Sequence, residues 1–438
     1  MLHRIIPRAF LFLAGVVAGI AAAAAAHARE DVIVWHALSG PQAAALARLA
    51  QRFNAAQKQY RVLASARGGL EATFAQALAL RRKRGAPHIV QIHESLTDEL
   101  IAEHLVVPLW QAMQAAHQPF EPHALPAVAG AFTDPQGRLL ALPYTSATPL
   151  LYYNRDALRR AKLDPAVPPA SWYALPDALA ALAAAGSACP FTAGAPASML
   201  LESMSAWHNR EFATQDNGFE GDGTRLTFND RLIVRWVAML STWRKSGYFV
   251  YAGRPGEAEK RFASGECALL ASSSADYPAL RSGAAFDLGV ARLPYYEDFD
   301  DAPQNTLAGG AAFWLLSGRP ASEYRGAVRF LAFLARPEIQ AEWQASTGFV
   351  PLTFSAYELA RREGYYLKQP GNEIAVHQLA DKTLTEESRP MRIADLARIR
   401  GIIDEELEAA WTGKKPSLDA LNAAVARGNE LLSGAARR

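Results

Sequence analysis

Short apolar runs alternate with helical patterns at the start of the chain, and this alternation restricts the fold more than any other feature of the sequence. The expected strands are 31–35, 60–66 and 88–92, and the expected helices begin at Pro41 and run over 71–82. In the first helix, Leu46, Leu49 and Phe53 recur at helical spacing and form one buried face. This β-α-β-α-β order predicts a parallel sheet with helices on both faces, and hence an α/β fold.

A second α/β unit follows. Its expected strands are 267–271 and 288–293, and its expected helices are 174–185 and 231–245. Strands 139–144 and 150–154 precede this unit, and a polar loop, a strand over 309–316 and helices over 324–334, 395–410 and 417–432 follow it. Ser171 is a favourable N-cap residue and is expected to start the helix over 174–185. A polar, proline-containing segment separates strands 139–144 and 150–154, which we expect to cross between two lobes. Ligands of such a hinged α/β clamshell bind in the cleft between the lobes.

The N-terminus has the layout of a cleaved signal peptide over residues 1–28. Arg4 and Arg8 precede an uncharged apolar run over 9–26, and an A-x-A site ends at Ala28. We therefore expect export to the periplasm, with an uncleaved membrane anchor as the alternative, because about 18 apolar residues just span a bilayer. The absence of any cysteine before Cys189 excludes a lipid-anchored N-terminus. The remaining 410 residues are too many for one core and favour two lobes.

The charge balance argues against nucleic acid or a membrane surface as partners. Without the signal peptide the chain has 43 basic and 43 acidic residues, and its basic run 81–84 suits a solvated helix end. Cys189 and Cys267 are the two cysteines, and an oxidising compartment permits a disulfide between them. Their spacing alone does not establish the bond.

Motifs for catalysis and for cofactors are missing from the sequence. It has no G-x-S-x-G and no G-x-G-x-x-G, and Gly413-Lys414 lacks the upstream glycine of a phosphate loop. His93-Glu94 has no second histidine at zinc-helix spacing, and the other histidines form no metal-ligand pattern. We therefore expect a binding protein, without cofactor or metal, that is not an enzyme.

Several segments carry a resemblance to a known family. They are Trp35-His36, LAQRFNA at 49–55, TPLLYYN at 148–154, Ser205-Ala206-Trp207, DAPQN at 301–305, Gly309-Gly310 and DEELEAAWTGKK at 404–415. Together they resemble the periplasmic sn-glycerol-3-phosphate-binding proteins of ABC importers, a branch of the extracellular solute-binding proteins. The resemblance implies a two-lobed, maltose-binding-protein-like fold that is monomeric and delivers its ligand to membrane permease subunits. It places the N-terminal lobe at 29–146 and 305–346, and the C-terminal lobe at 147–304 and 347–438.

Four residues match ligand positions of that family. The resemblance implies that Glu94 accepts hydrogen bonds from glycerol hydroxyls, and that Ser273, the Gly310 N–H and Arg400 hold the phosphate. The residue types suit these roles, because a guanidinium pairs bidentately with phosphate and glycine lets the backbone approach an anion. Without the resemblance, Arg400 is equally compatible with a surface position on a helix, and Glu94 with a loop carboxylate.

Five other ligand positions depart from the family pattern. Leu70 and Phe349 replace phosphate-facing tyrosines, Ala147 replaces a serine, and Ala195 and Ser198 replace two tryptophans that wall the glycerol. Each lost hydroxyl removes a charge-assisted hydrogen bond of about 1.5–3 kcal/mol. We therefore hypothesise that the chain binds glycerophosphodiesters such as glycerophosphocholine as well as, or better than, glycerol-3-phosphate.

Two other functions are compatible with this fold. An oligosaccharide-binding protein would share the architecture, but the missing tryptophans argue against it because sugars stack on aromatic platforms. A periplasmic glycerophosphodiester hydrolase would require a metal cluster or an activated nucleophile, and the sequence has neither pattern.

Overall fold

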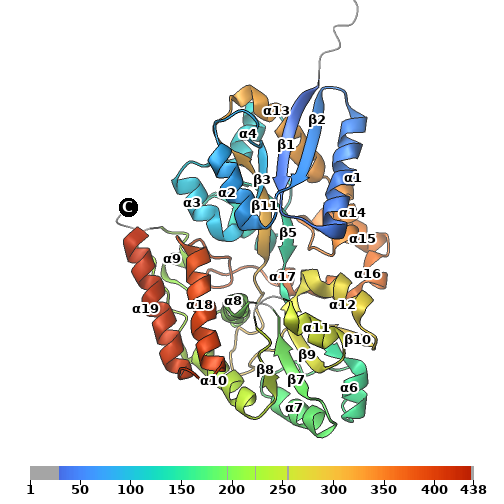
Figure 1. Ribbon diagram of the computed structural model, residues 1–438, viewed down its shortest axis with the longest axis vertical. Coiled ribbons are helices and arrows are strands. Elements are labelled where there is room, and N and C mark those ends of the chain that lie inside the picture. Colours follow the sequence, from blue (N-terminus) through green and yellow to red (C-terminus); the bar gives the residue numbers. More distant parts are fainter. Residues whose placement is uncertain (1–28, 195, 222, 254–255, 436–438) are drawn as a thin grey trace, which may run out of the picture.

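The computed structural model describes residues 29–194, 196–221, 223–253 and 256–435, and these residues form two lobes. Each lobe is built around one β-sheet, and the two lobes lie one above the other along the long axis (Figure 1). The expected signal peptide, residues 1–28, lies outside the described residues. None of the helices in the described ranges is long and apolar enough to cross a membrane.

The first lobe contains a six-stranded sheet with the order β2-β1-β3-β11-β4, and β5 also pairs with β11. Its strands are β1 (Glu30–His36), β2 (Tyr60–Ala66), β3 (Ile89–His93), β4 (Val106–Val107), β5 (Leu142–Ala147) and β11 (Gly309–Leu316). β1, β2 and β3 are parallel, but β11 is antiparallel to β3, β4 and β5. The predicted parallel arrangement of the first three strands is therefore confirmed, but the sheet as a whole is mixed, because β11 returns to it from the second lobe in the antiparallel direction.

Helices cover both faces of this sheet. α1 (Gly40–Ala56), α13 (Tyr324–Leu334) and α14 (Pro337–Thr347) pack on one face, and α2 (Leu70–Leu80) and α3 (Thr97–Ala102) pack on the other. The residues of β11 alternate between these faces: Phe313 and Leu315 join the first core, and Ala312 and Trp314 join the second. The other elements of this region are α4 (Leu109–Ala115), α5 (Pro126–Ala129), and the 3-10 turns Glu94–Leu96, Gly130–Phe132 and Ala321–Glu323. α15 (Phe354–Arg362) packs against α14.

The second lobe contains a five-stranded sheet with the order β10-β6-β9-β7-β8. Its strands are β6 (Pro149–Asn154), β7 (Cys189–Ala193), β8 (Phe249–Val250), β9 (Cys267–Ser273) and β10 (Leu288–Ala291). This sheet is also mixed: β7 is parallel to β8 and β9, and β6 is antiparallel to β9 and β10. Cys189 and Cys267 lie opposite each other on β7 and β9 and form a disulfide with a Cα–Cα distance of 4.4 Å.

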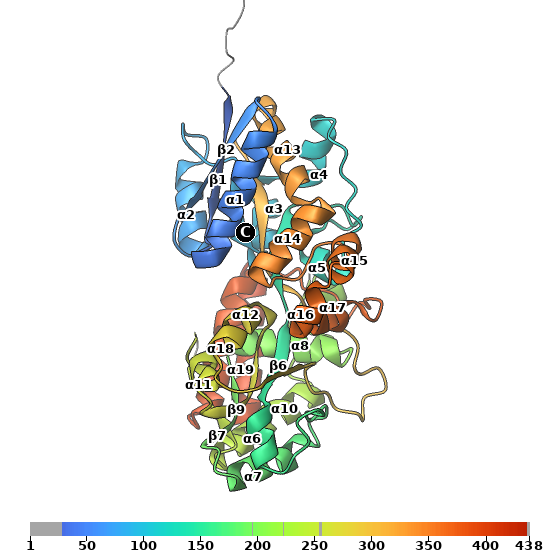
Figure 2. The same cartoon turned by 90° about the vertical axis from the view of Figure 1, so that its right-hand side faces the viewer.

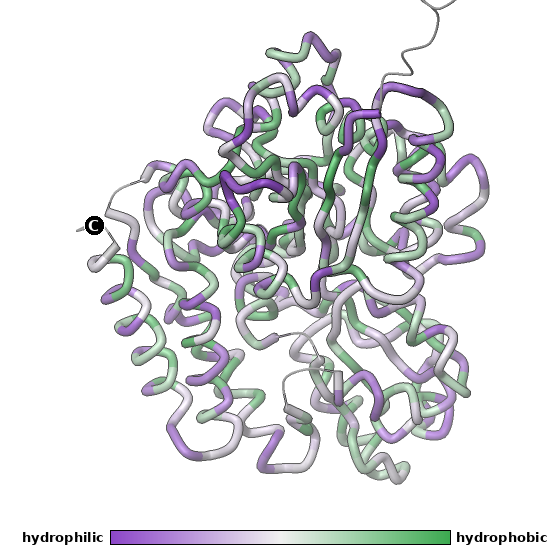
Figure 3. The backbone as a smooth tube through the Cα atoms, turned by 45° about the horizontal axis from the view of Figure 1, so that its top comes forward, coloured by the Kyte–Doolittle hydropathy of each residue, from purple (hydrophilic) through white to green (hydrophobic). Residues whose placement is uncertain are grey.

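Helices also enclose the second sheet. One core forms against α6 (Arg155–Arg160), α7 (Leu175–Ala184), α8 (Ala197–Trp207), α10 (Arg231–Lys245), α18 (Leu396–Trp411) and α19 (Ser417–Ala435). The opposite face packs against α11 (Glu257–Ala263), α12 (Tyr277–Gly283) and α17 (Pro370–Ala380), and α16 (Tyr365–Lys368) packs against α17. The short elements α9 (Thr214–Asn217) and the 3-10 turn Ser274–Asp276 complete this region. Hydrophilic and hydrophobic residues alternate along the outermost helix, α19, as expected for a helix with one buried side (Figure 3).

The predicted N-cap of α7 is wrong. The helix begins at Leu175 with Ala174 at the N-cap, and no side chain caps it. Ser171 lies three residues earlier, where its hydroxyl donates to Glu297 and accepts a hydrogen bond from the backbone N–H of Tyr173. Its acceptor, Glu297, is remote in sequence, so local capping preference could not predict that the Ser171 hydroxyl makes this hydrogen bond instead of capping the helix.

β5 and β6 carry the chain from the first lobe to the second, with only Thr148 between them. The predicted polar connection over 145–149 is therefore wrong, because most of its residues pair as strands. Ser146 lies opposite Gly310 in the first sheet, and Pro149 lies opposite Ser273 in the second. α17 lies at the level where the two lobes meet (Figure 2).

Buried hydrogen bonds fix this crossing. The Thr148 hydroxyl lies 2.7 Å from that of Thr306, which belongs to the segment that returns to the first lobe. Gln378 of α17 donates to the Thr306 hydroxyl and to the carbonyl of Pro149. Ser274 exchanges two hydrogen bonds with the backbone of Thr148. The two segments that cross between the lobes at Thr148 and at Thr306 are thus held in one polar network with α17 and the turn after β9.

Candidate ligand-binding site

Glu94 follows β3 directly and is buried where the two lobes meet. One carboxylate oxygen, Oε2, accepts the backbone N–H of Gly310 at 3.0 Å and lies 2.9 Å from Nδ1 of His93. The other, Oε1, accepts a hydrogen bond from Nη1 of Arg400 at 2.7 Å. The structure therefore brings together three of the four predicted ligand residues, one of them from the opposite lobe.

Arg400 lies on α18 and is bound by a second carboxylate that the sequence analysis missed. Glu202 of α8 accepts hydrogen bonds from Nε and Nη2 of Arg400, both at 2.8 Å, which is bidentate pairing. The side chain of Glu202 is only 3% exposed. The sequence did contain a signal for this residue: Glu202 is the single acidic residue in the apolar helical segment ASMLLESMSAW. A carboxylate buried in such a helix requires a charged or hydrogen-bonding partner.

The charges of this cluster stabilise one another against the cost of burial. Burial alone raises the pKa of Glu94, but His93 and Arg400 outweigh it, and the pKa falls to about 2. Burial also raises the pKa of Glu202, and there the opposing effect of Arg400 is smaller, so the pKa stays above its ordinary value. Burial lowers the pKa of Arg400, but Glu202 and Glu94 reverse this and raise it. The guanidinium therefore stays charged, and Glu202 is the carboxyl group more readily protonated.

The two glycines that open β11 differ in what their backbone positions require. Gly310 has a φ of +141°, and a Cβ placed there would lie 2.0 Å from the carbonyl oxygen of Thr145. Only glycine therefore fits at this position while its N–H points at Glu94. At Gly309 a Cβ would make ordinary contacts, the nearest being Glu94 Oε1 at 3.5 Å and Met199 Cε at 3.7 Å.

The cluster borders a small cavity between the lobes. Its volume is about 20 Å³, and its lining includes Glu94 and Gly309 from the first lobe and Met199, Glu202 and Arg400 from the second. Such a volume holds about one water molecule, whereas ligand pockets measure about 300–1,000 Å³. The described conformation is therefore closed at this point, and a solute of several heavy atoms enters only when the lobes separate.

Ser273, the fourth predicted ligand residue, does not contact the Glu94–Arg400 pair in the structure. It ends β9 opposite Pro149, and its side-chain oxygen accepts the N–H of Ala275. The predicted hydroxyl cluster is thus divided: Ser272 binds acidic side chains, and Ser274 binds the crossing strand. Only Ser273 of the three remains half-buried rather than fully buried.

Two of the substituted positions lie on the crossing strand or next to a residue that pairs with it. Ala147 is buried opposite Gly309. Phe349 is buried, stacks on Trp343 and precedes Val350, which bridges to Ser146. Leu70 is the first residue of α2 and is half-buried.

The two substituted wall positions lie near the start of α8. Ser198 is buried, and its backbone N–H donates to Asp404 of α18. Ala195 lies outside the described residues. Met199, which the sequence analysis did not single out, follows Ser198 and lines the small cavity.

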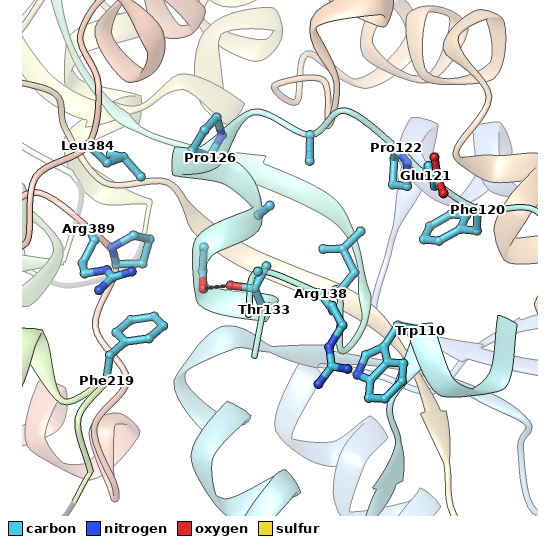
Figure 4. Close-up of a pocket in the computed structure, with 16 residues that line it drawn as sticks. Trp110, Phe120, Glu121, Pro122, Pro126, Thr133, Arg138, Phe219, Leu384 and Arg389 are labelled. Atoms are coloured by element: carbon cyan, nitrogen blue, oxygen red, sulfur yellow. Dashed lines mark hydrogen bonds between the residues drawn. The ribbon is translucent and has the colours of Figure 1, made fainter. Parts of the chain in front are cut away.

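A larger hollow of about 460 Å³ lies on the other side of Pro390, which lines both spaces. Trp110 and Arg138 border it from the first lobe, and Phe219 and Arg389 from the second (Figure 4). The Arg138 guanidinium lies 3.7 Å from the centre of a Trp110 ring, and that of Arg389 lies 4.3 Å from the centre of Phe219. Each guanidinium is also paired with an aspartate. None of the predicted ligand residues lines this hollow.

Comparison with known proteins shows one consistent family. The model of the bacterial extracellular solute-binding proteins matches residues 48–364. The chain is 39% identical to the sn-glycerol-3-phosphate-binding periplasmic protein UgpB of Escherichia coli, over 94% of this chain and 95% of that protein. It is 40% identical to UgpB of Salmonella typhimurium over 91% of each chain.

Solved structures confirm the predicted maltose-binding-protein-like fold. UgpB of Mycobacterium tuberculosis in complex with glycerophosphocholine is similar with a TM-score of 0.75 and 20% identity, over 94% of this chain and 99% of that one. The cyclic α-maltosyl-1,6-maltose binding protein of Arthrobacter globiformis is similar with a TM-score of 0.76 and 21% identity, over 93% and 100%. At this identity the likeness establishes the two-lobed architecture alone.

Proposed function

Because the chain belongs to the family of bacterial extracellular solute-binding proteins, we propose that it captures a glycerol phosphate and delivers it to the membrane subunits of an ABC importer. The observation that carries this proposal is the 39–40% identity, over more than nine tenths of the chain, to periplasmic proteins named for binding sn-glycerol-3-phosphate. The meeting of Arg400, Glu94 and the Gly310 N–H between two lobes supports it.

In the proposed complex, the ligand takes over bonds that the protein now makes with itself. Arg400 and the Gly310 N–H, which both donate to Glu94 in the closed structure, would donate to the phosphate, and Ser273 would add a hydroxyl. Glu94 would then accept hydrogen bonds from glycerol hydroxyls. Burial strengthens each of these charge-assisted bonds relative to water.

Closure of the lobes is the proposed transport signal. Glu94 and Gly310 belong to the sheet of the first lobe, whereas Ser273 and Arg400 belong to the second. A ligand that bonds to both sets binds the closed form more tightly and shifts the equilibrium toward it. We assign residues 29–146 and 305–346 to the first moving body, and 147–304 and 347–438 to the second.

We further propose that the protein works as a periplasmic monomer without catalytic activity. Residues 1–28 have the composition of a signal peptide, and the similar proteins of Escherichia coli and Salmonella are periplasmic. No release of phosphate or choline is expected when the protein is incubated for a long time with glycerophosphocholine. Turnover above the buffer blank would contradict this part of the proposal.

A phosphodiester is the ligand that suits the substituted positions. Leu70, Ala147 and Phe349 offer no hydroxyl to a phosphate, and the small residues Ala195 and Ser198 leave room at the glycerol side. A diester carries one negative charge and requires fewer donors than a monoester. These five positions are proposed to line the pocket when the lobes are open to ligand.

Calorimetric titration of the ligand-stripped protein with sn-glycerol-3-phosphate and with glycerophosphocholine tests the proposed function. Binding of either ligand is expected, and Arg400→Ala is expected to weaken it by about 2–5 kcal/mol because a buried phosphate then lacks its charged partner. Absence of binding for both ligands would overturn the proposal. A loss of only a few tenths of a kcal/mol in the variant would remove Arg400 from the site.

A further inference from the structure

Glu202 holds Arg400 against its own lobe. Both residues lie in the second lobe, on α8 and α18, which pack against each other. The two parallel hydrogen bonds, at 2.8 Å each, fix the plane of the guanidinium as well as its position. The side chain of Arg400 therefore approaches the cleft already oriented, and this orientation does not depend on the lobes being closed.

The same pairing limits what Arg400 offers to a ligand. A guanidinium has five N–H groups. Glu202 takes two of them and Glu94 takes a third in the closed form. When a ligand displaces Glu94, three N–H groups become available, but the Nε–Nη2 fork stays on Glu202. Arg400 therefore binds phosphate oxygens through the remaining N–H groups alone.

The charge around Arg400 is negative overall. Glu94 and Glu202 both contact its guanidinium, and Asp404 lies one turn further along α18, where its negative charge helps to raise the pKa of Glu202. Two carboxyl groups thus contact one permanently charged guanidinium, and the charge of a third, Asp404, acts on Glu202. A second negative charge on the ligand meets repulsion that the single cation does not cancel.

We propose that Glu202 sets the charge preference of the site: by orienting Arg400 and neutralising it, Glu202 favours a phosphodiester, whose phosphate group carries one negative charge, over a phosphate monoester, whose phosphate group carries two. This inference rests on the proposed function, and it identifies the residue that selects between the monoester and the diester. Glu202 acts through Arg400 and is a positioning residue: it borders the small cavity, but both of its carboxylate oxygens are bound to Nε and Nη2 of Arg400.

The test compares two ligands across three variants of the full mature chain. Affinities for sn-glycerol-3-phosphate and glycerophosphocholine are measured by calorimetry at pH 8, where the monoester is doubly charged because its second pKa is about 6. Wild type is expected to favour the diester. Glu202→Gln is expected to shift the ratio of the two dissociation constants at least about tenfold toward the monoester, because it removes one negative charge.

Two controls separate charge from packing. Glu202→Asp keeps the charge, so its ratio of dissociation constants is expected to stay within about threefold of wild type even if both affinities fall. Glu406→Gln makes the same chemical change on α18 at a carboxylate that pairs with Lys415 and Arg427, away from the cleft. Its ratio is expected to equal that of wild type.

A measurement on wild type alone covers the case in which Glu202→Gln does not fold. Between pH 8 and pH 5.5 the monoester loses its second charge, so its affinity is expected to rise about tenfold or more. The diester does not titrate in this range, so any change in its affinity reports protonation of the protein itself. The groups concerned are those that face Arg400 and Glu202, namely His93, Glu94, Glu202 and Asp404, and their contribution is subtracted from the change measured for the monoester.

The outcomes distinguish this inference from the proposed function. If wild type binds one or both ligands but Glu202→Gln leaves the ratio unchanged, or weakens both ligands equally, the inference is overturned and the proposed function stands. A flat pH dependence of monoester binding in wild type overturns it as well. If wild type binds neither ligand, both the proposed function and the inference fail.

Discussion

Glu94 and Arg400 form an ion pair of 2.7 Å that crosses from one lobe to the other. Two further contacts join the same regions: Arg392 donates to the carbonyl of Thr133, and the N–H of Asp395 donates to Glu99. The start of α18 is thus attached to the first lobe at three points. The closed form described here is stabilised by groups of the protein itself, in the place where the ligand is proposed to bind.

The first prediction concerns this closed form. Glu94→Ala removes the ion pair and the acceptor of the Gly310 N–H, and a charge-assisted hydrogen bond contributes about 1.5–3 kcal/mol. Each 1.4 kcal/mol changes an equilibrium tenfold, so the open form is expected to gain at least about tenfold. Small-angle scattering of the ligand-free protein is expected to show a larger radius of gyration for the variant.

The matched control breaks an ion pair within one lobe. Glu342→Ala removes the exposed partner of Arg52, which joins α1 and α14 of the first lobe. Its scattering curve is expected to match that of wild type. Superimposable curves for Glu94→Ala and wild type would show that the ion pair does not hold the lobes together.

The second prediction concerns the two glycines of β11. Gly310→Ala introduces a Cβ that would lie 2.0 Å from the Thr145 carbonyl oxygen at a φ of +141°. The strand pairing between β5 and β11 must shift to accept it, and a cost of about 3 kcal/mol or more in the free energy of unfolding is expected. Gly309→Ala meets only ordinary contacts and is expected to cost less than about 1 kcal/mol. Urea unfolding of the two variants measures the difference, and equal costs would contradict this account.

Local patterns predicted the bounds of several elements and the parallel direction of β1, β2 and β3, but not the antiparallel strands that complete the sheets. The bounds of β2, α10, β11 and α13 were predicted to the residue, since hydrophobic period and turn residues mark them in the sequence itself. The antiparallel direction of β11 depends on the route by which the chain returns from the second lobe. The strand pairing over 145–149 likewise depends on β11 and β9, which are remote in sequence. Such partners leave no local pattern.

The candidate site likewise contains residues that could be predicted from the sequence and one that could not. The resemblance to a family supplied Glu94, Gly310 and Arg400, and the structure places these three in contact. It did not supply Glu202, which binds Arg400 across 198 positions of sequence. Composition alone shows only that Glu202 interrupts an apolar helix. Identifying its partner required the packing of α8 on α18.

The third prediction concerns the disulfide. Cys189 and Cys267 are 78 positions apart, and removing a crosslink of that span frees the unfolded chain. Cys189→Ala combined with Cys267→Ala is expected to lower the free energy of unfolding by about 2–5 kcal/mol. Cys267 and Ser273 lie at opposite ends of β9, about 20 Å apart at 3.3 Å per residue. Ligand affinity, measured by calorimetry on the folded variant, is therefore expected to match wild type, and a large loss of affinity would contradict the assignment of the disulfide to stability.

The fourth prediction concerns a shared proton beside the crossing strand. The Ser272 hydroxyl lies 2.5 Å from Oε1 of Glu259 and 2.9 Å from Oδ2 of Asp276. A hydroxyl has one proton and donates to one acceptor, so one carboxyl group must carry a proton to complete the other hydrogen bond. Burial raises the pKa of Asp276 to about 6, with the negative charge of Glu259 adding to the effect. Asp276 is therefore the group expected to hold that proton.

A pKa that is higher in the folded than in the unfolded state means that the folded state binds more protons, so Asp276 stabilises the protein as the pH falls through about 6 toward 4. Above pH 6 the carboxylate is buried with its charge. Asp276→Asn donates the same hydrogen bond without a charge and is expected to raise the free energy of unfolding by about 1–2 kcal/mol at pH 7.5 and by much less at pH 5. Urea unfolding at the two pH values measures this change, with Asp300→Asn as the exposed control. An equal effect of Asp276→Asn at both pH values would show that Asp276 does not hold the shared proton.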